Sequence, residues 1–128
     1  MNLATALARR ADNPVRIALI GAGKFGTMIL AQLRHVSGVK LCVLADLNTG
    51  RAREAAVRAG WAAGQFTAAP SAAAANDVAR SGSVALVDSG EIAATCDIDI
   101  VIEATGFPDA AAREVGYSPA IIRWLEPS

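Results

Sequence analysis

The sequence contains little of what acid–base catalysis and metal binding usually require. Its 128 residues include a single histidine, His35, and only two of its twelve cationic side chains are lysines, Lys24 and Lys40. Two cysteines are present, Cys42 and Cys96, and they stand in or beside apolar runs rather than at the spacing of a metal site. We therefore predict limited acid–base chemistry and no metal centre, and we expect both cysteines to be buried free thiols, as in proteins of a reducing compartment.

An excess of one charge and a long apolar run are also missing. Twelve acidic residues balance the twelve basic ones, which leaves no basic surface for nucleic acid or an anionic membrane. The longest apolar runs have the length of a strand, which is too short to span a bilayer. In residues 1–12, Arg9 and Arg10 follow the apolar stretch, whereas a secretory signal places its charges first. We interpret this segment as an N-terminal arm and expect a cytoplasmic protein without a nucleic-acid or membrane partner.

Hydrophobic residues, by contrast, make up 53% of the chain, and their spacing changes along the sequence. Short, nearly continuous apolar runs predict strands buried on both faces, and a spacing of three and four residues predicts amphipathic helices. Much of the apolar share is alanine, so the core is expected to rest on Ile, Leu and Val. The predicted strands are 15–20, 39–45, 84–87 and 98–103, and the predicted helices are 24–36, 51–58, 72–80 and 109–115, with a weakly patterned connection at 62–69.

A glycine-rich turn joins the first predicted strand to the first predicted helix. It consists of Gly21, Ala22, Gly23, Lys24, Phe25 and Gly26 and fits the pattern G-x-G-x-x-G. Gly21 allows the tight turn, Gly23 lets the backbone approach a pyrophosphate, and Gly26 permits the helix to pack closely on the strand. The N–H groups at the start of the helix would then face the phosphates. The position of these glycines between a predicted strand and a predicted helix predicts a dinucleotide-binding turn. The alternative is a glycine-rich turn without a ligand.

The order of these elements predicts an α/β fold with a parallel sheet and covering helices. With the glycine-rich turn after the first strand, it indicates a Rossmann-type sheet in which the strands are ordered 3-2-1-4. Such a sheet normally continues, so we expect it to be incomplete at its C-terminal side. The exposed edge would favour homo-oligomers or poor solubility. Alternatively, the apolar residues Ile121, Ile122, Trp124 and Leu125 cover that edge.

Asp46 is the second candidate for binding a dinucleotide, because it ends the second predicted strand twenty residues after Gly26. A carboxylate there can accept hydrogen bonds from the adenosine ribose hydroxyls. It would also repel a 2′-phosphate, which slightly favours NAD over NADP. Arg51 and Arg53 follow closely and could offset this preference, so the choice of cofactor stays open. The alternative for Asp46 is a turn-forming role after a strand.

The third candidate segment, Glu103-Ala104-Thr105-Gly106, comes where the fourth predicted strand meets its loop. In a sheet ordered 3-2-1-4, the ends of the first and fourth strands flank the crevice that receives the dinucleotide. We therefore expect Ala104, Thr105 and Gly106 near the middle of the dinucleotide, on the side of the nicotinamide. Glu103 either orients this loop or is a plain carboxylate at a strand end.

Other residues carry weaker signals. Asp97, Asp99 and Glu103 could suggest a metal cluster, but Asp99 and Glu103 flank an ordinary strand and no histidine joins them, so we favour solvated strand ends. Trp61 and Trp124 are expected to pack against other residues rather than to stack on a ligand.

Two other classes of enzyme with glycine-rich turns are excluded. An S-adenosylmethionine methyltransferase usually carries an acidic residue just before its glycines, where this chain has Leu19 and Ile20. A short-chain dehydrogenase needs a lysine four residues after its tyrosine, and here Ile121 stands four residues after Tyr117.

Two segments resemble the homoserine dehydrogenase-like oxidoreductases. Residues 14–26 are similar to the opening of that family, and residues 97–106 match its segment leading to the nicotinamide loop. The first segment reads Pro14-Val15-Arg16-Ile17-Ala18-Leu19-Ile20-Gly21-Ala22-Gly23-Lys24-Phe25-Gly26, and the second Asp97-Ile98-Asp99-Ile100-Val101-Ile102-Glu103-Ala104-Thr105-Gly106. An Ala-rich insert before Val84 resembles the SAF-domain branch, which includes deoxyxylulose-phosphate reductoisomerase-like enzymes. The similarity covers roughly residues 13 to 112.

The resemblance implies an NAD(P)-binding domain at 13–112, with residues 21–26 as the dinucleotide turn, Asp46 at the ribose, and Thr105 and Gly106 at the cofactor. Full-length relatives transfer hydride between the nicotinamide and a carbonyl or alcohol of a small metabolite. Their catalytic lysine and carboxylates belong to a later domain, so we expect this chain not to be catalytic alone. The pattern departs after about Arg113, which makes 113–128 a divergent tail of an apparently truncated or frame-shifted chain. The alternatives are a non-enzymatic dinucleotide-binding or interaction module and an inert remnant of a broken gene.

Overall fold

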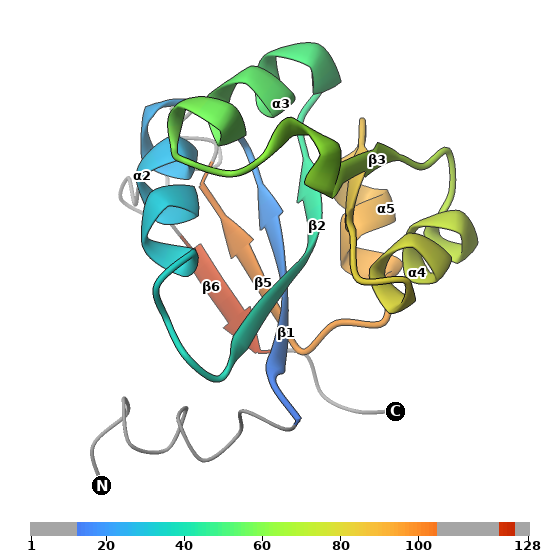
Figure 1. Ribbon diagram of the computed structural model, residues 1–128. Coiled ribbons are helices and arrows are strands. Elements are labelled where there is room, and N and C mark those ends of the chain that lie inside the picture. Colours follow the sequence, from blue (N-terminus) through green and yellow to red (C-terminus); the bar gives the residue numbers. More distant parts are fainter. Residues whose placement is uncertain (1–12, 105–120, 125–128) are drawn as a thin grey trace, which may run out of the picture.

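The computed structural model describes residues 13–104 and the backbone of 121–124. Six strands form one sheet in the order β3-β4-β2-β1-β5-β6, and Figure 1 shows helices on both of its sides. The strands are β1 (Val15–Ile20), β2 (Val39–Ala45), β3 (Phe66–Ala68), β4 (Val84–Val87), β5 (Ile100–Glu103) and β6 (Ile121–Trp124). The helices are α2 (Lys24–Leu33), α3 (Thr49–Arg58), α4 (Ala72–Arg80) and α5 (Gly90–Thr95), with a 3-10 turn η1 (Ala63–Gln65).

The predicted strands lie side by side in the predicted order. β4, β2, β1 and β5 are successive neighbours, and every pairing among them is parallel. They are the third, second, first and fourth strands of the sequence analysis, so the order 3-2-1-4 is confirmed. The chain therefore has a Rossmann-like α/β fold, and the order of its strands reverses between β1 and β5.

Three short elements within residues 13–104 are missed by the sequence analysis. Residues 62–69, expected as a plain connection, contain η1 and β3, and β3 pairs parallel with the outer side of β4. α5 connects β4 to β5, where the sequence indicates two strands in direct succession. β3 has three residues and α5 has six, which is too short to display a strand or helix period. The fourth predicted strand also starts later than expected, at Ile100.

The expectation of an exposed edge beside β5 is wrong, because β6 occupies that edge. β6 runs antiparallel to β5, with Ile121 opposite Glu103 and Trp124 opposite Ile100. The alternative, that the C-terminal segment covers this edge, is confirmed for the backbone of residues 121–124, and Leu125 lies outside the described residues. The homo-oligomer stays a prediction. The helix expected at 109–115 lies outside the described residues.

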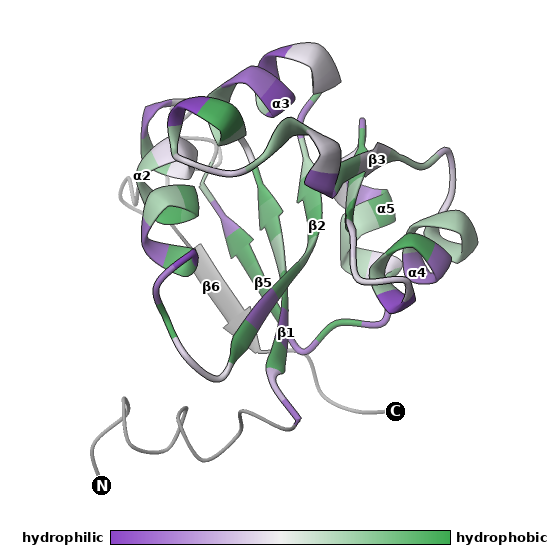
Figure 2. Ribbon diagram, in the orientation of Figure 1, coloured by the Kyte–Doolittle hydropathy of each residue, from purple (hydrophilic) through white to green (hydrophobic). Residues whose placement is uncertain are grey.

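Each face of the sheet has its own apolar cluster. Along β1, Ile17 and Leu19 pack in one cluster with Leu30 of α2, whereas Ala18 packs in a second cluster with Ala93 of α5. Figure 2 shows apolar strands enclosed between the helices. As predicted, Leu and Val supply the largest fully buried side chains: Leu19, Leu30, Leu44, Val43, Val87 and Val101. No described helix has the length and apolar character that crossing a membrane requires.

A bulge in β2 changes which side chains face each cluster. Ile17 of β1 lies opposite Leu41, but the next residue, Ala18, lies opposite Val43, so Cys42 is an extra residue in β2. Because a shift of one residue exchanges the two faces of a strand, Leu41 and Leu44 both join the first cluster although they are three positions apart. The bulge therefore determines which side chains at the carboxyl end of β2 face each of the two apolar clusters.

Both cysteines are free and buried, as predicted. Burial raises the pKa of Cys42 and the pKa of Cys96, because a thiolate loses hydration inside the protein. Since the thiolate is the reactive form, we expect both to react slowly with a chromogenic disulfide reagent in the folded protein at about pH 8, and rapidly in urea. A time course of released chromophore measures this, and fast reaction of either thiol without urea would contradict their burial.

Leu44 tests the core of the sheet, because it is 0% exposed between two neighbouring strands. We expect Leu44→Ala to lower the free energy of unfolding by about 2–5 kcal/mol, through lost burial and the remaining cavity. Val57 is 45% exposed, and Val57→Ala should change the free energy of unfolding by less than about 0.5 kcal/mol. Urea titrations followed by circular dichroism provide both values, and equal values for the two variants would show that Leu44 is not a core residue.

Candidate functional site

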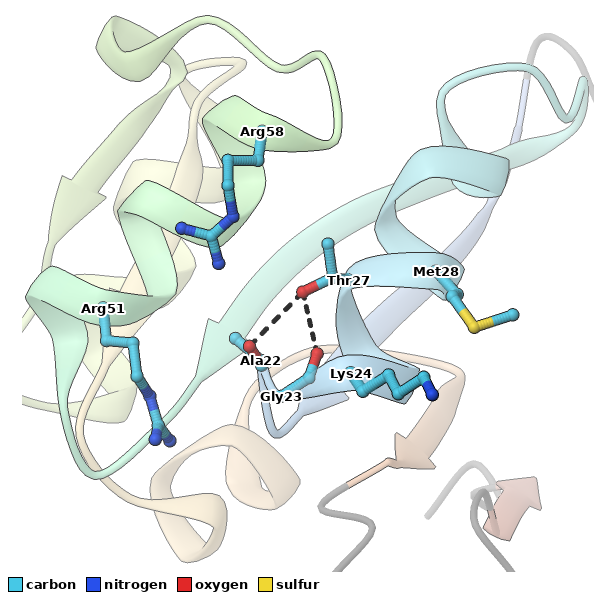
Figure 3. Close-up of a pocket in the computed structure, with 7 residues that line it drawn as sticks. All are labelled: Ala22, Gly23, Lys24, Thr27, Met28, Arg51 and Arg58. Carbon is cyan, nitrogen blue, oxygen red and sulfur yellow. Dashed lines mark hydrogen bonds between the residues drawn. The ribbon is translucent and has the colours of Figure 1, made fainter.

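The glycine-rich turn connects β1 to α2 at the carboxyl end of the sheet. Gly21 has a φ of 97°, a left-handed conformation that glycine adopts without strain, and its N–H donates to the Ala45 carbonyl at 2.7 Å. The Thr27 hydroxyl donates to the Gly23 carbonyl at 2.7 Å and lies 3.4 Å from the Ala22 carbonyl (Figure 3). The turn is therefore held by β2 on one side and by α2 on the other.

The N-terminus of α2 differs from those of the other described α-helices. Asn48, Ser71 and Ser89 accept hydrogen bonds from the first backbone N–H groups of α3, α4 and α5, respectively. The N-cap of α2 is Gly23, and among the described residues no side chain caps this end and no acidic residue lies in the first turn. The first N–H groups of this ten-residue helix, at the positive end of its dipole, are thus able to receive an anion.

Gly26 marks the closest approach between α2 and the turn. A Cβ at this position would overlap the Gly21 carbonyl oxygen and would lie 4.0 Å from the Ala104 carbonyl oxygen. This is the close helix–strand packing expected for the third glycine. Ala104 is fully buried, and its N–H donates to the Ile20 carbonyl at 2.8 Å. The residue that follows β5 therefore packs against the turn, at the place between β1 and β5 where the order of the strands reverses.

Asp46, predicted at the ribose, is 8% exposed and joins two loops. Its Oδ2 accepts the Ala22 N–H at 2.9 Å, and its Oδ1 accepts the Asn48 N–H at 2.9 Å. Arg51 adds Nη2 at 3.1 Å from Oδ1 and 3.3 Å from Oδ2. The turn-forming role considered for this residue is therefore present, and it is combined with an ion pair at the entrance to α3.

Two cavities meet at this end of the sheet, and both are lined by Gly23 and Arg51. The first measures about 460 Å³ and lies between α2 and α3. The second measures about 350 Å³ and lies over the carboxyl ends of β1, β2 and β4. The other residues around the first are Ala22, Lys24, Thr27, Met28 and Arg58. Those around the second are Ile20, Gly21, Ala45, Asp46, Leu47, Asp88 and Gly90.

The structure thus gathers most of the predicted site residues at one location. The turn and Asp46 border the cavities, whereas Phe25 packs against the first apolar cluster, and Gly26 and Ala104 lie behind the turn. Thr105 and Gly106 lie outside the described residues. Glu103 ends β5 next to Ile20.

Sequence reasoning did not find the carboxyl end of β4 or Arg58, the last residue of α3. Asp88 and the 92% exposed Leu47 border the second cavity; the rule that parallel strands bring their carboxyl ends together would have indicated Asp88. Arg58 lines the first cavity with Arg51, and their spacing of seven residues puts them on one helix face. Arg53, considered from the sequence beside Arg51, instead donates to the Phe66 carbonyl at 3.0 Å.

Asp97 and Asp99 lie away from these cavities, in ion pairs with Arg16. Arg16 Nη1 is 2.7 Å from Asp97 Oδ2, and Nη2 is 3.0 Å from Asp99 Oδ1. The Asp99 N–H donates to the Arg16 carbonyl at 2.8 Å, which connects the start of β1 to the chain entering β5. These carboxylates therefore join strands at the amino end of the sheet, where the sequence analysis favoured plain solvated strand ends.

No protein-family model matches the chain, and a search of curated proteins finds no significant match. The resemblance to homoserine dehydrogenase-like oxidoreductases therefore stays a prediction. Fold alone does not define a function, which depends on the geometry and chemistry of the site.

The space at Gly26 can be tested by adding one methyl group. We expect Gly26→Ala to lower the free energy of unfolding by at least about 2 kcal/mol, because the Cβ would push α2 away from the turn. Gly64→Ala is the matched control, since no atom lies within 4 Å of a Cβ built at Gly64. Urea titrations of both variants give the comparison, and equal stabilities would argue against the close approach of Gly26 to Gly21.

Proposed function

We propose that this chain binds a nicotinamide dinucleotide, NAD(H) or NADP(H), as the cofactor-binding domain of an oxidoreductase of the homoserine dehydrogenase-like type. One observation carries the proposal: the uncapped N-terminus of α2 follows a glycine turn with no room for a Cβ at Gly26, beside a cavity bordered by Asp46. A helix N-terminus suits a pyrophosphate, and the end of the second strand suits the adenosine ribose.

The pyrophosphate would lie against Gly23 and the first turn of α2. Gly23 borders both cavities, so a diphosphate there would lie next to an adenosine in the second cavity. The absence of a side chain at Gly23 lets phosphate oxygens come within hydrogen-bond distance of the backbone. Lys24 is exposed at the same end of the helix and adds a positive charge.

The adenosine would occupy the second cavity, over the ends of β2 and β4. Leu47 is 92% exposed at its border, and such an apolar side chain can cover one face of an adenine ring. The ribose would lie beside Asp46 and Arg51, the charged pair at the end of β2.

The nicotinamide would extend from the turn toward β5, past Ala104. The bound dinucleotide would supply the hydride chemistry, and the residues described above would bind and orient it. We assign no catalytic residue to this site and propose that the groups acting on the substrate, a small carbonyl or alcohol metabolite, come from elsewhere in a full-length oxidoreductase.

A carboxylate at Gly23 would separate binding from folding. Gly23 has a φ of −76° and an extended backbone, which other residues adopt. In Gly23→Asp the new carboxylate would cap α2 and repel the pyrophosphate. We expect thermal stability to be kept or raised, and the affinity for NADH and NADPH to fall at least about tenfold, the effect of 1.4 kcal/mol.

Titrations followed by nicotinamide fluorescence and by calorimetry measure these affinities, with Gly64→Asp as a control that adds the same charge away from both cavities. The control should bind like the wild type. A folded wild-type chain that binds neither dinucleotide at about millimolar concentration, the weak end of specific affinities, would overturn the proposal. Unchanged affinity in Gly23→Asp would exclude the glycine turn as the site.

A further inference from the structure

We infer that this site prefers NADP(H) to NAD(H), with Arg51 and Arg58 receiving the 2′-phosphate of the adenosine ribose. The inference rests on the proposed function and specifies its ligand. It reverses the preference that Asp46 alone suggests, and it follows from three features: the hydrogen bonds that Asp46 already accepts, the donors that Arg51 keeps, and the charge of the first cavity.

The carboxylate of Asp46 is fully engaged inside the protein. Its Oδ1 accepts from Asn48 N–H and Arg51 Nη2, and its Oδ2 accepts from Ala22 N–H and Arg51 Nη2. Two carboxylate oxygens offer about four lone-pair positions, so these contacts use them all. To accept both ribose hydroxyls of NAD(H), Asp46 would have to give up its bonds to Arg51.

The repulsion expected between Asp46 and a 2′-phosphate is also offset. The side chain of Asp46 is only 4% exposed, and its partner Arg51 is 59% exposed. A phosphate approaching from solvent therefore meets the guanidinium before the carboxylate. Because both short contacts use Nη2, Asp46 does not occupy the Nε–H and Nη1 donors of Arg51, which could therefore bind a phosphate.

The first cavity extends this positive charge. Arg58 lies two helical turns beyond Arg51, about 10 Å along α3, and both side chains extend from α3 on the side where the glycine turn lies (Figure 3). Lys24 extends along the other side of α2 in the same view. The described lining residues of this cavity include these cations and no carboxylate. Paired arginines suit a phosphate dianion, because each presents several donors in a plane.

The experiment compares ligands that differ only in the 2′-phosphate. The full chain is titrated with NADPH and NADH, and with adenosine 2′,5′-bisphosphate and 5′-AMP, by calorimetry at fixed ionic strength. We expect each 2′-phosphorylated ligand to bind at least about tenfold more tightly than its partner, as for a charge-assisted hydrogen bond. Arg58→Gln should reduce NADPH affinity about five- to tenfold and should leave NADH affinity within about twofold. Arg51→Gln should also reduce NADPH affinity, but it should keep or raise NADH affinity, because Asp46 is then free to accept the ribose hydroxyls. Arg80→Gln, which removes the same charge from α4, serves as the control and should change neither.

The outcomes separate this inference from the proposed function. Equal affinities for NADPH and NADH, or tighter binding of NADH, would overturn the preference for NADP(H) while dinucleotide binding stands. Equal losses for both dinucleotides in Arg58→Gln would show that this arginine does not read the 2′-phosphate. Failure of all four ligands to bind a folded chain would overturn the proposed function and this inference together.

Discussion

The carboxylate of Asp46 holds together the two loops from which the site is built, and the geometry on either side depends on it. Ala22 and Asn48 donate backbone N–H groups to it from loops on two different strands. Both loops leave the sheet at its carboxyl end, where backbone groups no longer find partners in the sheet ladder. A buried N–H without an acceptor costs about 1–3 kcal/mol, so this one side chain fixes the turn against the start of α3.

This arrangement brings the uncapped N-terminus of α2 and the guanidinium groups of α3 to the same cavity. Asn48 caps α3 while Gly23 leaves α2 uncapped, so the two adjacent helices present different surfaces to the same cavity. α2 offers peptide dipoles, and α3 offers guanidinium groups. The chain has no net charge, but the first cavity is locally positive, because its described lining residues include Lys24, Arg51 and Arg58 and no carboxylate. Other charged residues pair away from this cavity, as Arg16 does with Asp97 and Asp99.

The sheet positions these groups through register as much as through order. The bulge at Cys42 shifts the pairing of β1 with β2, so that Gly21 N–H meets the Ala45 carbonyl at the point where the turn begins. Gly26 then brings α2 down until only a hydrogen fits beside the Gly21 carbonyl. Helix, turn and strand are therefore in direct contact, and the α2 N-terminus points at a defined place.

The sequence by itself determined β1, β2, β4 and most of β5, the helices α2, α3 and α4, and the glycine turn, because these depend on local periodicity and on steric limits within a few residues. It also marked Asp46 through its distance from the turn. Only the tertiary structure decided that Asp46 is engaged by Arg51, that Arg58 joins the cavity while Arg53 turns to Phe66, and that β6 closes the edge beside β5. These outcomes depend on contacts between residues distant along the chain. Short elements such as β3 and α5 have too few residues to show a recognisable sequence pattern, and they depend on packing for their stability.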